Sequence, residues 1–236
     1  MMASEGGANE SARAGPILMA WAVLVVALNA VLWGSGFRER ELVGAVERGA
    51  ARAESAGVGE VDEGVVREAI RLQRESRTFW GALILLADFG FEPLMPAART
   101  LAAGTLFAAF AAISGRKVRF GETLAGCAAA QGFWVAGLAT RVGLMVALRR
   151  PEVETSLALF LPAGAYPAAT WLAIRQVDAF AILGWAATAR VGWRLGQIGP
   201  VPVVATVVGL AAIEAAARVA LAAAVGAGMR LAIEMN

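Results

Sequence analysis

Long apolar runs alternate with short charged segments along most of this chain, and the pattern predicts a bundle of membrane-spanning helices. Residues 17–37 read ILMAWAVLVVALNAVLWGSGF, with no charged side chain. At about 1.5 Å per residue, a helix of this length crosses a hydrocarbon core of about 30 Å. Trp21 and Trp33 lie near its two ends, which is typical of aromatic residues at the headgroup layer. We therefore expect a first transmembrane helix over 17–37, after a disordered or loose tail over 1–16.

Residues 38–78 are charged throughout, and their apolar residues recur at helical spacing. Leu42, Val46 and Ala50 fall on one helical face, and a second amphipathic stretch covers 65–72. The sequence AGVG separates the two stretches. This pattern predicts an amphipathic helical hairpin outside the membrane.

Residues 79–226 are mostly apolar and predict the membrane core, followed by a C-terminal tail over 227–236. Prolines at 93 and 96 predict a helix break. Either a short re-entrant or interfacial helix precedes a span over 97–113, which is favoured, or two spans meet here. Further spans are expected over 123–148, 157–174, 177–191 and 201–225. The predicted fold class is all-α: a polytopic membrane helical bundle with about six transmembrane helices, five to seven being compatible with the pattern.

The most basic short connection is GRKVRFG, which contains Arg116, Lys117 and Arg119. Short loops with clustered Lys and Arg remain in the cytoplasm, so this loop is placed there. Counting spans from the loop places the RRPEVE segment at 149–154 outside and the turn at 175–178 inside.

Composition agrees with a membrane protein and excludes several function classes. The chain is 58% hydrophobic and 17% charged, whereas soluble domains are about 25% charged. A net charge of +2 is too small to favour nucleic acid as a partner. Histidine is absent, which removes the commonest metal ligand and general base, and the single Cys127 excludes a Cys-rich metal site. We predict no enzyme, no metal and no cofactor, and only peripheral lipid or pigment contacts.

Ionisable residues at membrane depth are candidates for function because they are costly to insert. The predicted spans and their ends contain Asp88, Glu92, Arg99, Arg141, Asp178, Arg190, Arg194, Glu214 and Arg218. Glu214 and Arg218 lie four residues apart in the middle of the last span, so they form an internally neutralised pair or a polar bridge to another helix or a transported ion. Arg141 is a further candidate for that bridge.

An intramembrane enzyme would need a nucleophile or a pair of carboxylates, and Asp88 with Glu92 is the one such pair close in sequence. Pro93 and Pro96 place these two acids at a predicted helix end, so an interfacial role is favoured over catalysis.

Two short motifs stand at the starts of predicted spans. The first is a Gly-basic loop, a Phe and a Thr-Leu-Ala entry into a span, formed by Gly115, Lys117, Phe120, Thr123, Leu124 and Ala125. The second is an Asp-x-Phe opening of a span that runs to a Gly, formed by Asp178, Phe180 and Gly192. Both motifs resemble those of the bacterial branch of the YIP (Ypt-interacting protein) domain family. The sequence departs from the family at Leu183, where a Trp is frequent, and at 131–134, where a Tyr and a Pro are often found.

The resemblance implies a multi-span membrane protein and gives no catalytic residue to carry over to this chain. Eukaryotic members of the family resemble adaptors that engage small GTPases, and some bacterial members resemble companions of transporters. We expect a non-catalytic adaptor or accessory subunit of the bacterial inner membrane, with membrane lipid and other membrane proteins as partners. The alternative is a small transporter or channel component that uses Glu214 and Arg218 within the membrane.

Overall fold

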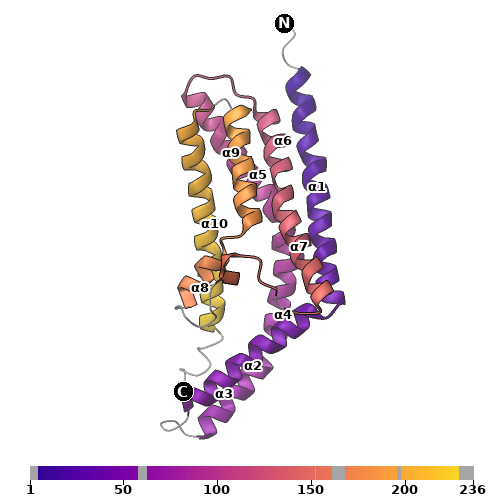
Figure 1. Cartoon of the computed structure of the whole chain (residues 1–236), viewed down its shortest axis with the longest axis vertical. Coiled ribbons are helices and arrows are strands. Elements are labelled where there is room, and N and C mark those ends of the chain that lie inside the picture. The colour runs from indigo at the N-terminus through magenta and orange to yellow at the C-terminus, as the bar shows by residue number, and fades with distance from the viewer. Residues whose placement is uncertain (1–4, 58–62, 152, 161–167, 196–197, 229–236) are drawn as a thin grey trace.

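The computed structural model describes residues 5–57, 63–151, 153–160, 168–195 and 198–228. All regular elements within these residues are helices (Figure 1). Four helical segments, over 13–34, 70–113, 120–148 and 200–223, are long and apolar enough to cross a membrane. The predicted helical membrane bundle is therefore confirmed, whereas the count of six spans is not.

Helix α1 runs over Glu5–Gly34, so it begins within the segment 1–16 for which a disordered or loose tail is predicted. Once the apolar run has nucleated a helix, each further residue costs little to add, and Pro16 does not end it. Ala14 is already buried, at 2% exposure. The helix thus extends beyond the apolar run that predicted it.

The charged segment forms helices α2, Phe37–Gly57, and α3, Glu63–Glu75, and is followed by the short helix α4, Arg77–Leu86. Leu42 and Val46 of α2 pack against Trp80 and Ile84 of α4. Figure 1 shows α2 and α3 as a hairpin that extends beyond one end of the bundle, which we call the hairpin end. The opposite end holds residues 114–119 and is called the basic-loop end.

The chain does not break at Pro93 and Pro96. A π-helical turn, η1, Ala87–Phe91, leads directly into α5, Glu92–Ile113. Pro93 lies in the first turn of α5, a position that the fixed φ of proline suits. The helix that crosses the membrane therefore includes Glu92. In place of the break predicted at the prolines, the helical pitch changes one turn before Pro93, in η1.

The predicted span over 123–148 consists of two helices that meet at Gln131. Helix α6 covers Phe120–Ala130 and α7 covers Gly132–Leu148. The Trp21 ring packs against Gly132, where an added Cβ would lie 3.0 Å from a ring carbon, and its indole N–H donates to the Ala128 carbonyl at 3.0 Å. This contact fixes the junction at which α7 takes a new direction.

The segment 157–174 is not a single crossing of the membrane. Its described parts are the 3₁₀ turn η2, Leu157–Phe160, and helix α8, Ala168–Arg175. The Leu157 N–H donates to the Val177 carbonyl at 2.9 Å, so the two ends of the segment are adjacent. The RRPEVE segment and the 175–178 turn therefore lie on the same side, which contradicts their expected placement on opposite sides.

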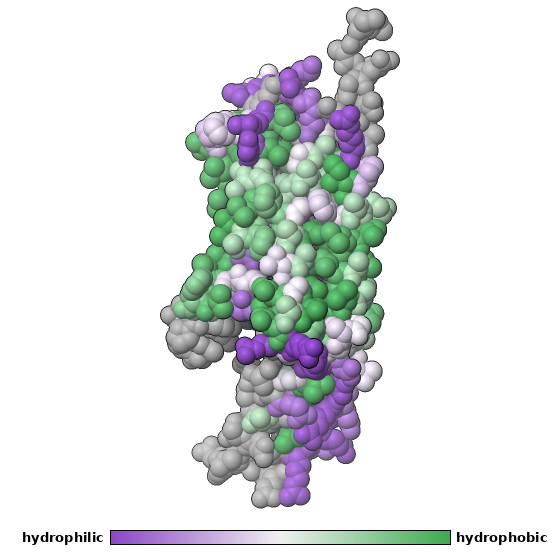
Figure 2. Space-filling view, turned by 45° about the vertical axis from the view of Figure 1, so that its right-hand side comes forward, coloured by the Kyte–Doolittle hydropathy of each residue, from purple (hydrophilic) through white to green (hydrophobic). Residues whose placement is uncertain are grey.

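Helix α9, Ala179–Arg194, begins inside the bundle and ends near the basic-loop end, and α10, Pro200–Gly228, returns along the bundle (Figure 1). Figure 2 shows one face of the bundle, which is mostly apolar along its length, with hydrophilic residues gathered at its ends and on the hairpin. This surface matches the solvent that a membrane bundle contacts along its sides.

The bundle has two different halves. The closed half, toward the basic-loop end, holds the main apolar core: Ala103, Phe107, Ala111, Cys127, Ile198, Val203 and Val207. Helix α6 packs between α1, α5 and α9 in this half. The cavity half, toward the hairpin end, has α7 in place of α6, and the bundle there encloses a polar space.

Candidate functional site

A cavity of about 330 Å³ lies in the cavity half. Its walls come from five helices that form a ring. The order around the ring is α1, α5, α10, α9 and α7, and each helix packs against the next, with α7 packing against α1. In the closed half α6 packs against α1, α5 and α9, whereas in the cavity half α7 packs against α1 and α9, and the cavity lies between α7 and α5. The lining contains five arginines and four acids: Arg38, Arg99, Arg141, Arg175, Arg218, Glu92, Glu154, Asp178 and Glu214.

Three helices line the cavity with residues at positions i, i+3, i+4 and i+7, which is one face of an α-helix. The lining residues are Glu92, Met95, Pro96 and Arg99 on α5, Trp134, Gly137, Leu138 and Arg141 on α7, and Ala211, Glu214, Ala215 and Arg218 on α10. An arginine ends each of the three stripes. The same stripes carry most of the ionisable residues found within the predicted spans, so these charges converge on one space.

The deeper layer of the cavity is a closed ion network around Glu214. Arg99 donates to the two Glu214 carboxylate oxygens from Nε and Nη2, at 2.8 and 2.5 Å. Arg218 donates from Nε to the same carboxylate at 3.0 Å, and its Nη2 forms an ion pair with it at 2.9 Å. The Arg99 guanidinium also lies over the Trp134 ring, 4.7 Å from its centroid. Two arginines share one carboxylate, so this layer has a net positive charge.

Glu214 and Arg218 thus form the polar bridge that the sequence allowed as one alternative, but the residue across the bridge is Arg99 and not Arg141. Sequence spacing could not choose between them because both arginines lie in apolar helices. Arg99 is the better partner because its side chain is 7% exposed and lies opposite Glu214 in the fold.

Arg141 and Glu92 are the two charged residues of the cavity that remain without a partner among the described residues. The Arg141 Nε is buried and has no hydrogen-bond partner. Glu92 is half-buried, and its carboxylate is not part of any hydrogen bond or ion pair within the described part of the chain. Unpaired charge at membrane depth costs a few kcal/mol, roughly 2–4 on insertion scales, so these two side chains are the prime candidates for binding a ligand.

Residues 153–156 and 175–178 form the wall of the cavity nearest the hairpin end. Arg175 pairs with Glu154 at 2.8 Å, and the Thr155 hydroxyl donates to Asp178 at 3.0 Å. Asp178 is the N-cap of α9, and its carboxylate accepts the backbone N–H of Phe180 at 2.6 Å. The start of α9 within the bundle is therefore stabilised by its own capping residue.

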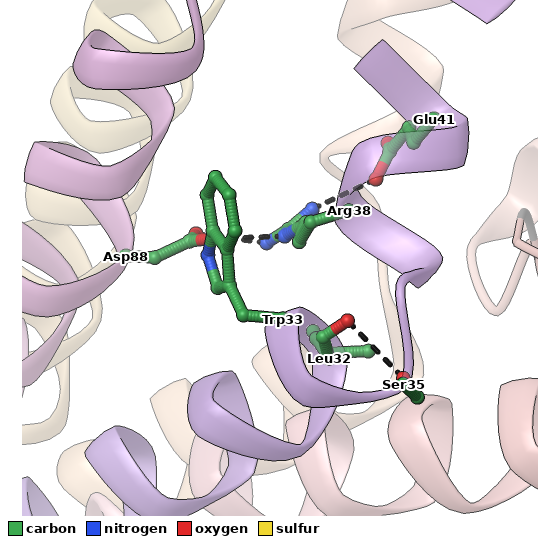
Figure 3. Close-up of polar contacts among 6 residues, drawn as sticks. All are labelled: Leu32, Trp33, Ser35, Arg38, Glu41 and Asp88. Carbon is green, nitrogen blue, oxygen red and sulfur yellow. Dashed lines mark hydrogen bonds and ion pairs between the residues drawn. The ribbon is translucent and has the colours of Figure 1, made fainter. Parts of the chain in front are cut away.

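A second buried polar network joins the hairpin to the bundle beside the cavity. The Asp88 carboxylate accepts two bonds from Arg38, at 2.8 and 2.9 Å, and one from the Trp33 indole N–H at 2.9 Å. Figure 3 shows Trp33 and Arg38 directed at Asp88, with Glu41 on the far side of Arg38. Burial opposes the charge of Arg38, but the ion pairs with Asp88 and Glu41 hold the pKa of its guanidinium above the ordinary value.

The Asp88 backbone explains why Asn29 is buried in an otherwise apolar helix. The backbone N–H of Glu92 donates to the Ala87 carbonyl, five residues earlier, as expected in a π turn. The next donor would be the N–H of residue 93, but residue 93 is a proline and has none. The Asp88 carbonyl therefore has no donor within its own helix. The Asn29 side-chain amide supplies one at 2.7 Å, which satisfies a carbonyl that would otherwise be orphaned in the membrane.

The remaining sequence-predicted residues lie away from the cavity, with two exceptions. Arg116, Lys117 and Arg119 are exposed at the basic-loop end, next to Phe120 at the start of α6. Gly192 packs against Phe107 in the closed half. Asp178 and Phe180 do line the cavity. No signal in the sequence singled out Asn29 or Trp134, because both lie in apolar runs and acquire their roles only across helices.

Among the described residues, no group of three or more acidic or cysteine side chains is placed to hold a metal ion. Comparisons with protein families, with curated proteins and with solved structures gave no match. The resemblance to the YIP domain family therefore stays a prediction from short motifs, and function must be argued from the cavity.

Proposed function

We propose that this chain is a small membrane transporter, or the solute-binding component of one, that takes a small polar molecule into the cavity. The observation that supports the proposal is unpaired charge, Arg141 and Glu92, in a cavity walled by apolar helices. A cavity of about 330 Å³ lies at the small end of the range of roughly 300–1,000 Å³ that ligand sites occupy. The proposed membrane is the bacterial cytoplasmic membrane.

A π turn and two prolines border the cavity on α5, and interrupted helices often line the binding sites of membrane transporters. Helix α9 begins within the bundle, and its start borders the same space. These irregular segments lie in the cavity half, where motion would change access to the site.

Cysteine accessibility tests this function without knowledge of the substrate. Cys127 is the one cysteine of the chain and is buried, so a Cys127→Ala protein provides a cysteine-free background. Ala215→Cys adds a thiol to the cavity wall, and Ala212→Cys adds one to an exposed position of the same helix outside the cavity lining. A charged, membrane-impermeant thiol reagent should modify the first and not the second, because thiolate forms in water and not in lipid.

Sealed vesicles of both orientations then separate transport from static binding. A transporter exposes the cavity in turn to the two sides, so Ala215→Cys should react with reagent added to either side. Reaction from one side alone would overturn transport and leave a one-sided binding site. Absence of reaction from both sides would overturn the proposal of a water-filled cavity.

A second candidate is the membrane adaptor or accessory subunit, and the hairpin favours it. Helices α2 and α3 are held together by exposed ion pairs such as Arg74 with Glu47. Helix α4 leaves Phe79, Leu83 and Leu86 exposed, at 59, 39 and 53%. Such an apolar face next to the membrane suits either lipid or a partner helix.

Native mass spectrometry of protein purified in mild detergent tests the adaptor function. A stoichiometric partner that is lost from the Leu83→Asp variant and kept by an Arg40→Asp control would support it. A monodisperse chain without a partner in wild type would count against it.

A further inference from the structure

The charges that remain unpaired in the cavity lie at one depth. Arg99 stacks on Trp134, so these two residues are level in the bundle. Helices α5 and α7 run in opposite directions in Figure 1. Glu92 precedes Arg99 by seven residues and Arg141 follows Trp134 by seven, so both lie about 10 Å nearer the hairpin end at the rise of an α-helix.

Glu92 and Arg141 therefore form an outer layer of the cavity, below the closed Glu214 network. They come from α5 and α7, which are not consecutive in the ring of helices around the cavity, and they do not pair with each other. One negative and one positive group thus face the same space with neither one neutralised by the described protein. The arrangement is complementary to a molecule that carries both charges.

We propose that the outer layer binds a small zwitterion, with its carboxylate on Arg141 and its ammonium group on Glu92. This inference rests on the proposed function of the cavity as a solute site. A simple anion would leave Glu92 unpaired, and a simple cation would leave Arg141 unpaired. A zwitterion pairs both side chains and brings no net charge to membrane depth, where each unneutralised charge is costly.

The other lining residues indicate what kind of side chain the zwitterion carries. Val25, Leu138, Phe180 and Trp185 add apolar and aromatic surface to the cavity. This surface suits an apolar group between the two charges, as in an amino acid with an aliphatic or aromatic side chain. An ethanolamine lipid headgroup carries a phosphate in place of the carboxylate and an ammonium group of the same kind, so it is the second source of this chemistry.

Binding of free amino acids to the full chain in detergent tests the inference. Leucine and phenylalanine should bind, and every other amino acid is tried singly. The N-acetyl derivative, which lacks the ammonium group, and the methyl ester, which lacks the carboxylate, should each bind at least tenfold more weakly. In Glu92→Gln the penalty for N-acetylation should disappear, and in Arg141→Gln the penalty for esterification should disappear. Arg190→Gln, exposed on α9 outside the cavity lining, is the control that should keep both penalties.

The melting temperature of each variant is measured first, and Arg141→Met, which is also neutral, replaces Arg141→Gln if the latter fails to fold. Nanodiscs with ethanolamine or glycerol headgroups provide the lipid arm. Retention of ethanolamine lipid by wild type, and its loss from Glu92→Gln, would assign the site to a headgroup. Amino-acid binding that both variants keep unchanged would overturn the inference.

If no free amino acid and no ethanolamine lipid binds, the proposal of a zwitterionic ligand is wrong. The labelling of Ala215→Cys then tests the proposed transport function separately. Labelling from both sides would keep the transport proposal with a different solute. Labelling from one side or none would overturn both.

Discussion

The closed half and the cavity half of the bundle are built from largely the same helices, but different contacts hold these helices together in the two halves. In the closed half, Gly192 allows the Phe107 ring to approach so closely that an added Cβ would lie 2.6 Å from it. Such contact between a small residue and a large one replaces the hydrophobic effect, which does not drive helices together in lipid. In the cavity half, α5 and α10 are joined instead by the Arg99–Glu214 bridge.

Tight contacts between glycine and an aromatic ring occur in both halves, since Gly184 packs against Trp134 in the cavity half, but only the cavity half adds an ion bridge among the described residues of its core. The closed half is held by close packing of its apolar core and by the hydrogen bond from Trp21 to the Ala128 carbonyl. The cavity half is held at its inner layer by charge, and the charges of its outer layer are left free for a ligand. Four predictions test this division, in order of decreasing effect.

Arg99→Met should destabilise the protein most, by about 3 kcal/mol. Removal of one partner of a buried ion pair costs roughly 3–5 kcal/mol, and the lower end applies because Arg218 still neutralises Glu214. Equilibrium unfolding in mixed micelles measures the loss. The double variant Arg99→Met with Glu214→Gln should recover much of it, and equal stability of Arg99→Met and wild type would refute a structural role for the bridge.

Gly192→Ala should destabilise the closed half by about 1–3 kcal/mol, which is typical of overpacking. The matched control is Gly209→Ala on α10, where an added Cβ would meet no atom within 4 Å. That change should be neutral or stabilising by up to about 1 kcal/mol, since alanine is the better helix former. Thermal melts in detergent compare the two variants. A smaller loss of stability for Gly192→Ala than for Gly209→Ala would show that close packing at Gly192 does not stabilise the closed half.

Asn29→Ala should cost about 1–2 kcal/mol, because it leaves the Asp88 carbonyl buried without a donor. Pro93→Ala restores an N–H to α5 at the position that the π turn needs. The two changes should therefore be non-additive in a double-mutant cycle, with the second recovering part of the loss. Strict additivity would show that the Asn29 bond does not compensate for the proline.

Arg141→Met should cause no loss of stability, because Arg141 has no partner among the described residues to lose and an unpaired charge is removed from the membrane. Binding of the solute should fall sharply in the same variant. The contrast with Arg99→Met in the same unfolding assay separates the ligand layer from the structural layer. A loss of stability at Arg141 as large as at Arg99 would remove the distinction between them.

Much of the fold was predictable because the membrane imposes simple rules on sequence. An uncharged run as long as 17–37 has few alternatives to a spanning helix, and the amphipathic spacing around Leu42 and Val46 predicts the hairpin helices. The path of the chain around 157–178 was not predictable in this way. An apolar run of that length reads as a crossing, and only the bond between Leu157 and Val177 shows that the segment returns to its starting side.

The sequence by itself determined the helical membrane class and the presence of ionisable residues within the spans. It also determined that Glu214 and Arg218 share a helical face. The tertiary structure decided that Arg99 completes their bridge, that Asn29 serves the carbonyl left free by Pro93, and that Glu92 and Arg141 lie level and unpaired. The physical reason is that helical spacing fixes neighbours along one helix, whereas a cavity depends on the depth and direction of several helices at once.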